Sequence, residues 1–259
     1  MNAFPRVQRM VETSFSANRV TPASKVKLGL SVDTSKTKYT IDDTIITGNK
    51  SSWDLSALFV RSLGQHWSAG AYLEAMSSIY SNIDLGTIVA PAVEYNFFPY
   101  SQSTRRQLRA LYRLNFAIVK YREETVYGKL RQTLLQESLA LTLDLREKWG
   151  TVSVSTEASN YFHDISKYRV DTFGVVNLRL YKGLSTYVLG GYSWVHDQIY
   201  LLGRDPTYEE TLLRLRELPT NSNYFVAFGF QFQFGSIFTN VINPRFGSSG
   251  SGGMNIHIN

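Results

Sequence analysis

The feature that most constrains this fold is an alternation of side chains with a period of two residues. It is clearest at 224–238, YFVAFGFQFQFGSIF, where Tyr224 and Phe228 belong to a set of large residues separated mostly by small or amide residues. Because successive side chains of a β-strand point to opposite faces, this segment predicts a strand with one aromatic face. The same alternation predicts about eleven strands, at 9–19, 24–37, 51–62, 66–79, 84–98, 105–121, 134–147, 150–161, 167–181, 184–200 and 224–238.

Composition removes several classes of protein. No run of about 18 apolar residues occurs, so a transmembrane helix is not expected. The chain has no cysteine, and its net charge of +6 is spread along the sequence apart from the short cluster TRRQLR at 104–109. The sequence therefore lacks a disulfide framework, a thiolate zinc site and the basic stripe typical of nucleic-acid binding. We expect no nucleic-acid partner.

Two architectures accommodate so many alternating strands, a soluble sandwich and a closed barrel. Three features favour a barrel in a membrane. The strands run to about 12–16 residues, whereas globular strands usually have about five or six and a bilayer needs about 9–11. Short connections alternate with longer ones, which include 36–50 and 122–133. Aromatic residues such as Trp67, Tyr95 and Tyr168 fall near strand ends or on outward positions, as in the girdles of membrane proteins.

We therefore predict an all-β fold, an antiparallel up-and-down transmembrane β-barrel, with about eleven strands in this chain and about twelve in the complete protein. Residues 1–8 are expected to form part of an outer loop, 9–238 the barrel and 239–259 a flexible Gly/Ser-rich tail. One loop helix is expected at 206–218, where Asp205 can cap the helix and Pro206 fits its first position. Pro91 interrupts the strand at 84–98, and we expect a bulge there.

The N-terminal sequence MNAFPRVQRMVETSF has no apolar signal-peptide core. An up-and-down barrel whose short turns are periplasmic needs an even number of strands. Both observations lead us to expect an N-terminally incomplete chain, whose longer parent protein carries the signal peptide and a further strand. Without that strand, the sheet would either keep a seam of unpaired edges or close around a smaller circumference.

The last strand resembles the terminal-strand assembly signal of bacterial outer-membrane barrels. Gly229, Phe232 and Phe234 match that pattern, whereas Ala227 stands where the pattern prefers a polar residue. More broadly, the chain resembles a family of uncharacterised outer-membrane β-barrel proteins of diderm (Gram-negative-type) bacteria. This resemblance rests on SANRVT (16–21), SLGQHWSAG (62–70), APAVEYNFFPYSQSTRRQL (90–108), FHDISKYR (162–169), EETLLRLREL (209–218) and FGSIFTNVINPRFG (234–247).

The resemblance implies a location in the bacterial outer membrane, with outer-membrane lipid and the barrel-assembly machinery as partners. It also implies longer relatives that carry additional N-terminal sequence. It implies no established activity, so no functional residues are carried over from the family.

Motifs for catalysis and metal binding are lacking. The four histidines, His66, His163, His196 and His257, do not lie in a metal-binding spacing, and no phosphate-binding or nucleophile motif occurs. We therefore expect no enzyme activity, no cofactor and no metal.

Charge on the polar faces of the predicted strands is the best guide to function. The candidate lumen residues are Arg109, Arg113, Asp144, Glu157, Arg169, Asp171 and Arg179. One interpretation is a charged constriction that selects solutes by sign, which predicts a narrow porin-like channel for small polar solutes. The other is a mutually neutralising ladder that fills the lumen, which predicts a structural barrel that anchors or docks another envelope component. Neither the solute nor the oligomeric state is predicted.

Overall fold

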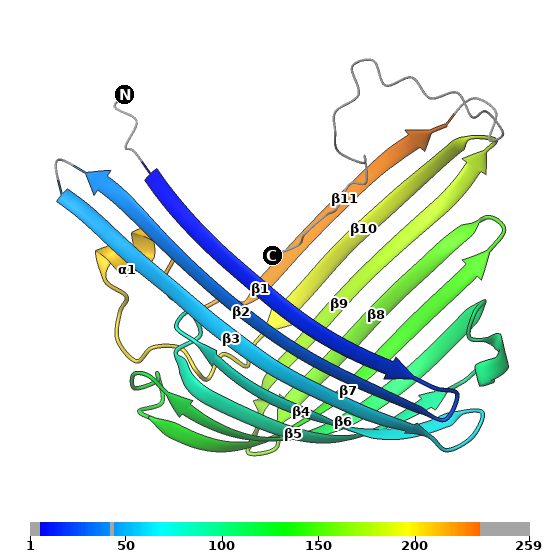
Figure 1. Ribbon diagram of the computed structural model, residues 1–259, viewed down its shortest axis with the longest axis horizontal. Coiled ribbons are helices and arrows are strands. Elements are labelled where there is room, and N and C mark those ends of the chain that lie inside the picture. Colours follow the sequence, from blue (N-terminus) through cyan, green and yellow to red (C-terminus); the bar gives the residue numbers. More distant parts are fainter. Residues whose placement is uncertain (1–5, 42–43, 234–259) are drawn as a thin grey trace.

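The computed structural model describes residues 6–41 and 44–233, and almost all of this part of the chain is β-sheet (Figure 1). A 3₁₀ turn, η1 (Tyr100–Gln102), and a short helix, α1 (Tyr208–Leu212), lie in two of the connections. The strands are β1 (Arg6–Val20), β2 (Ser24–Ile41), β3 (Thr44–Ser62), β4 (Trp67–Ser78), β5 (Ile83–Asn96), β6 (Arg106–Tyr121), β7 (Arg131–Glu147), β8 (Gly150–Tyr161), β9 (Asp164–Tyr181), β10 (Leu184–Val195) and β11 (Ser222–Phe232).

Each strand pairs antiparallel with the next, which gives one 11-stranded sheet in the order β1 to β11. The prediction of an all-β, antiparallel up-and-down fold is therefore confirmed. Figure 1 shows this sheet twisted and curled into an open trough, with β1 and β11 as its two edges. No pairing joins these edges within the described residues, so the sheet keeps a seam.

The hairpin of β2 and β3 corrects the expectation of a long loop at 36–50. The two strands stay paired as far as Ile41 and Thr44, so only residues 42–43 lie between them. Threonine and isoleucine are frequent in this stretch, and β-branched residues favour strands. Short and long connections consequently do not alternate strictly. The longest connection, 196–221, and the connection at 122–130 lie at one end of the strands, which we call the loop end, whereas the connection at 97–105 is as long as 122–130 and lies at the opposite end. The opposite end is the turn end.

Three further expectations need correction. β1 begins at Arg6, so the expected outer loop at 1–8 extends too far. The loop helix covers only Tyr208–Leu212, because Arg214 has a positive φ of 49° and the helix cannot continue through it. Pro91 pairs with Ala71 of β4, and the register with β6 is the same on both sides of it, so there is no bulge. The expected tail at 239–259 lies outside the described residues.

The outer face of the sheet is apolar and uncovered. Phe15 is 65% exposed, Phe59 52%, Phe116 48% and Phe228 71%. The strand register joins such residues into lateral rows, one of which crosses β1 to β7 through Ala17, Leu28, Ala57, Leu73, Val89, Phe116 and Leu135. An apolar surface this extensive is far larger than the patches that monomeric soluble proteins expose. Within the described ranges, no helix is long and apolar enough to span a bilayer.

Candidate functional site

The inner face of the sheet carries the charged residues, and Arg109 of β6 is the centre of the first group. Its Nη1 lies 3.6 Å from Glu94 Oε2 on β5, and its Nη2 lies 3.3 Å from Asp144 Oδ2 on β7. The hydroxyl of Ser153 on β8 donates a 2.7 Å hydrogen bond to Asp144 Oδ1. A polar chain therefore crosses four adjacent strands.

A second group is centred on Arg113, further along β6. Arg113 forms an ion pair with Glu157 of β8, and its Nε donates a 3.2 Å hydrogen bond to Ser138 Oγ of β7. Glu157 lies directly opposite Asp171 in the pairing of β8 with β9. Like charges in such positions repel, so each carboxylate needs a cation of its own. Arg169 supplies the second one, since its Nε lies 2.7 Å from Asp171 Oδ2.

Arg169 also connects the inner face to the connection that follows β10. Its Nη1 lies 3.8 Å from Oδ1 of Asp197, whose side chain is only 11% exposed. Burial raises the pKa of Asp197 above its ordinary value, while the charge of Arg169 acts in the opposite direction. Asp197 Oδ1 accepts no hydrogen bond from the described part of the chain.

Six of the seven predicted lumen residues thus take part in ion pairs, and Arg179 is the exception. It lies near the turn end of β9, where it is exposed. Its backbone N–H donates to Trp149 O at 2.7 Å. Its side chain forms no hydrogen bond or ion pair with any residue that the structure describes. Arg179 therefore belongs to neither of the two ion-paired groups on the inner face.

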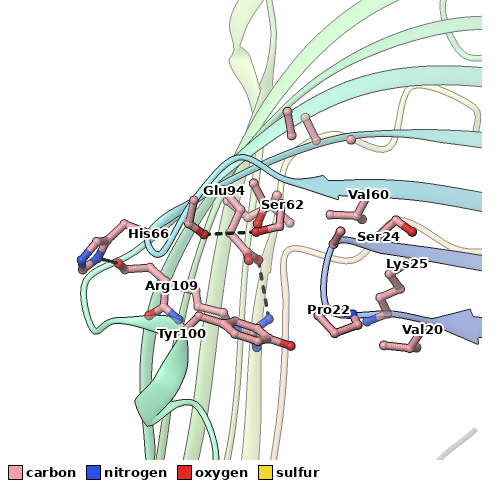
Figure 2. Close-up of a pocket in the computed structure, with 18 of the residues that line it drawn as sticks. Val20, Pro22, Ser24, Lys25, Val60, Ser62, His66, Glu94, Tyr100 and Arg109 are labelled. Carbon is pink, nitrogen blue, oxygen red and sulfur yellow. Dashed lines mark hydrogen bonds and ion pairs between the residues drawn. The ribbon is translucent and has the colours of Figure 1, made fainter.

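A cavity of about 380 Å³ opens at the turn end (Figure 2). Lys25 lines it from the start of β2 and His66 from the β3–β4 turn, and the pair Glu94–Arg109 lines it from β5 and β6. His66 Nδ1 lies 2.6 Å from the carbonyl oxygen of Asn96. The inner face is therefore hollow from the turn end as far as the first ion-paired group.

The loop end is partly covered by one long connection. Residues 196–221, which we call the capping loop, leave β10 and reach the β4–β5 turn and the β6–β7 connection. Leu202 forms an isolated β-bridge with Thr125, and the N–H of Glu217 donates a 3.1 Å hydrogen bond to Tyr80 O. The loop also approaches β3, where a Cβ added to Gly48 would lie 2.6 Å from Leu213 Cδ1. The absence of a side chain at Gly48 allows this close approach.

A ring of four charged residues holds the capping loop in place. Arg204 lies 2.9 Å from Glu123 and 2.8 Å from Glu210, and Arg216 lies 2.5 Å and 3.2 Å from the same two carboxylates. Glu123 belongs to the β6–β7 connection, so the ring ties that connection to the capping loop. Hydrogen bonds from Arg204 lower the pKa of Glu210 to about 2, and Glu210 and Glu123 raise the pKa of Arg204.

An apolar cluster lies under the capping loop, and sequence reasoning missed it. Ile199 of the loop is 3% exposed and packs against Val119 and Tyr121 of β6 and Leu134 of β7. A signal was present in the sequence. Ala117, Val119 and Tyr121 continue the polar phase of β6 with apolar residues, so this end of the strand is apolar on both faces. Such a stretch predicts cover on the inner face as well.

The predicted assembly signal is only partly described. Gly229 lies on the inner face, where an added Cβ would come within 2.6 Å of the ring of Tyr187. Phe232 is 62% exposed on the outer face. Phe234 lies outside the described residues. The structure thus gives Gly229 a packing role, and the role in assembly stays a prediction.

The histidines do not converge. His66 lies at the turn end, whereas His196 stacks on Tyr168 at the loop end, with ring centroids 4.9 Å apart. Among the described residues, no group of three or more His, Cys, Asp or Glu side chains is placed to hold a metal ion. His257 lies outside them.

Comparisons with known proteins give no family and no function for this chain. No protein-family model matches the chain, and no curated protein matches it. One similar solved structure is that of the NanC porin in a rhombohedral crystal form, with a TM-score of 0.40 and 10% sequence identity over 90% of this chain and 100% of that one. The functional conclusions below therefore rest on the residues of this chain.

Proposed function

We propose that this chain is an outer-membrane β-barrel protein that forms a narrow porin-like channel for small polar solutes. The observation that carries the proposal is the opposite chemistry of the two faces. The outer face exposes large apolar residues such as Phe116 and Phe228, whereas the inner face holds ion pairs beside a cavity open at the turn end. Apolar residues outward and polar residues inward are the arrangement of membrane barrels.

A channel lined in this way would discriminate weakly by charge. Arg109, Arg113 and Arg169 each lie beside at least one carboxylate, so little net field extends into the lumen. Small polar solutes of either sign are therefore the expected substrate class. No catalytic group, metal or cofactor is needed for passive conduction, and we propose none.

Function in lipid also requires closure of the seam. β1 and β11 run in the same direction, because an even number of antiparallel pairings separates them. Unpaired backbone groups are costly in hydrocarbon. One strand antiparallel to both edges would pair with both at once. Outer-membrane lipid and the barrel-assembly machinery are the partners that this proposal requires.

The second candidate function, a filled barrel that anchors or docks an envelope component, is favoured by one observation. The capping loop and the cluster around Ile199 occupy the loop end of the inner face. If the loop never moves, the path along the inner face stays narrowed at this end.

Single-channel recording in planar lipid bilayers separates the two candidates. The channel proposal predicts discrete, steady current steps with a weak preference between cations and anions. Protein that is folded by circular dichroism and heat-modifiable on gels, yet gives no current over a wide voltage range, would instead support the filled barrel. Recording a variant with a shortened capping loop (residues 204–216 replaced by a short Gly/Ser linker) then tests whether the loop is the barrier.

A further inference from the structure

A small cavity of about 140 Å³ lies on the inner face, beneath the capping loop and apart from the ion-paired groups. Its walls include Ile83 of β5, Ala117 and Val119 of β6, and Leu134 of β7. Ile199 of the capping loop completes it on the remaining side. Val119 is 8% exposed, Leu134 6% and Ile199 3%, so these walls are shielded from solvent.

The cavity has no charged lining residue, and nearly all its polar groups already have partners. The hydroxyl of Tyr121 donates to Gln132 (2.8 Å), and that of Tyr200 donates to Glu217 (2.7 Å). The amide of Asn115 donates to Gln136 Oε1 (3.3 Å). A charged ligand would lose its hydration here without gaining a counter-charge, which is costly.

Tyr161 also lines the cavity, and its hydroxyl differs from those of Tyr121 and Tyr200 because it has no hydrogen-bond partner among the described residues. Its side chain is half-buried at the end of β8, and its hydroxyl forms no hydrogen bond with any residue in the described ranges. This hydroxyl is not among the fully buried atoms of the described residues that lack a partner, so it is accessible and free to donate or accept a hydrogen bond. A ligand with one hydroxyl group of its own could supply that partner.

We propose that this cavity is a binding site for a small uncharged monocyclic aromatic compound with one hydroxyl group, a phenol. An apolar cavity of about 150 Å³ in another protein accepts benzene, so the volume fits a single six-membered ring. The ring would contact the aliphatic walls, and its hydroxyl would pair with Tyr161. Binding at this site does not depend on ion conduction, because none of the charged residues that carry the channel proposal lines the cavity.

Fluorine NMR titration of 4-fluorophenol against the purified full chain in detergent micelles tests the proposal. The expected result is saturable binding at one site, beyond the partitioning seen with empty micelles. Ala117→Leu fills the cavity and should weaken binding at least tenfold. Ala158→Leu makes the same change on the exposed outer face of β8 and should leave binding unchanged. Equal binding to wild type, to Ala117→Leu and to empty micelles would overturn the proposal.

A second pair of measurements protects the test against a misfolded variant. Tyr161→Phe removes the hydroxyl and keeps the ring, so it should weaken binding of 4-fluorophenol severalfold and leave fluorobenzene unaffected. Leu134→Ala enlarges the cavity and should improve binding of a larger phenol such as 6-fluoro-2-naphthol. If fluorobenzene and 4-fluorophenol respond identically to Tyr161→Phe, the assigned role of the hydroxyl is wrong.

Discussion

The capping loop should open far more often when Arg216 is truncated. This guanidinium is 12% exposed and contacts Glu210, which is 15% exposed, and Glu123, which is 35% exposed. It also donates a 2.8 Å hydrogen bond to the carbonyl oxygen of Ile79 in the β4–β5 turn. Arg216→Ala removes all three interactions and leaves the Ile79 carbonyl to find another donor.

The magnitude follows from the burial of the partners. Breaking a buried ion pair by removing one member costs about 3–5 kcal/mol. Arg204 still contacts both carboxylates in the variant, and Glu123 is partly solvated. We therefore expect about 2–3 kcal/mol, which corresponds to roughly a 30- to 150-fold increase in the open population.

Hydrogen–deuterium exchange with mass spectrometry measures this population directly. Amides of 196–221 should exchange faster by that factor, while the amides of β7, β8 and β9 should keep their wild-type rates. Arg179→Ala is the matched control, since Arg179 is exposed and its side chain has no partner within the described residues. An increase below about threefold, or an equal increase in the control, would refute the reasoning from the four-residue ring.

Three other predictions concern pH, selectivity and assembly. The pKa of Glu210 is lowered from 4.5 to about 2, so the contribution of Glu210 to capping-loop stability is complete above pH 4.5 and is lost as the pH falls toward 2. Protease cleavage of the loop should therefore increase as the pH falls from 4.5 to 2. A cleavage rate that does not change with pH in this range would contradict the assigned role of Glu210. Arg109→Ala leaves Glu94 beside the turn-end cavity and Asp144 on β7 without their shared cation. Reversal potentials in a salt gradient should therefore shift toward cation preference, whereas Arg179→Ala should shift them little. Gly229→Ala should destabilise the folded protein by about 1–3 kcal/mol through overpacking and so lower its yield, because the new methyl group meets the Tyr187 ring. Adding Tyr187→Ala should restore the yield. If it does not, contact with Tyr187 is not the cause of the loss.

The strands were predictable because alternation is a local property. Each strand has an apolar outer face and a more polar inner face, and this difference is visible in the sequence because side chains alternate between the two faces. The bounds of β2 and β3 were not predictable in the same way. Tyr39 and Thr37 lie in a polar stretch that reads as a loop, and only their pairing with Ile46 and Gly48 makes them strand residues. Pairing partners are set by tertiary structure and not by local composition.

The ion pairs of the inner face were partly predictable for a related reason. Arg109 and Asp144 lie on adjacent strands of an up-and-down sheet, so their proximity follows from strand order once the polar phase is known. The capping loop could not be placed from sequence. Its path from β10 to the β4–β5 turn depends on contacts between residues far apart in the chain, such as Arg216 with Ile79. The partial helix at Tyr208–Leu212 gave no indication of that direction.

The two candidate functions differ in the behaviour of one segment and not in the architecture. The turn end is hollow as far as Arg109, and the ion-paired walls beyond it are polar enough to pass hydrated solutes. At the loop end, the cluster around Ile199 and the ring of Arg204, Arg216 and two glutamates narrow the path. Arg204 and Glu123 of this ring are half-exposed, so their part of the attraction is screened by solvent and salt, whereas Arg216 and Glu210 are shielded. Conductance that rises with ionic strength more steeply than the bulk conductivity would therefore identify a channel gated by the capping loop, and its absence in the Arg216→Ala variant would tie the effect to this ring.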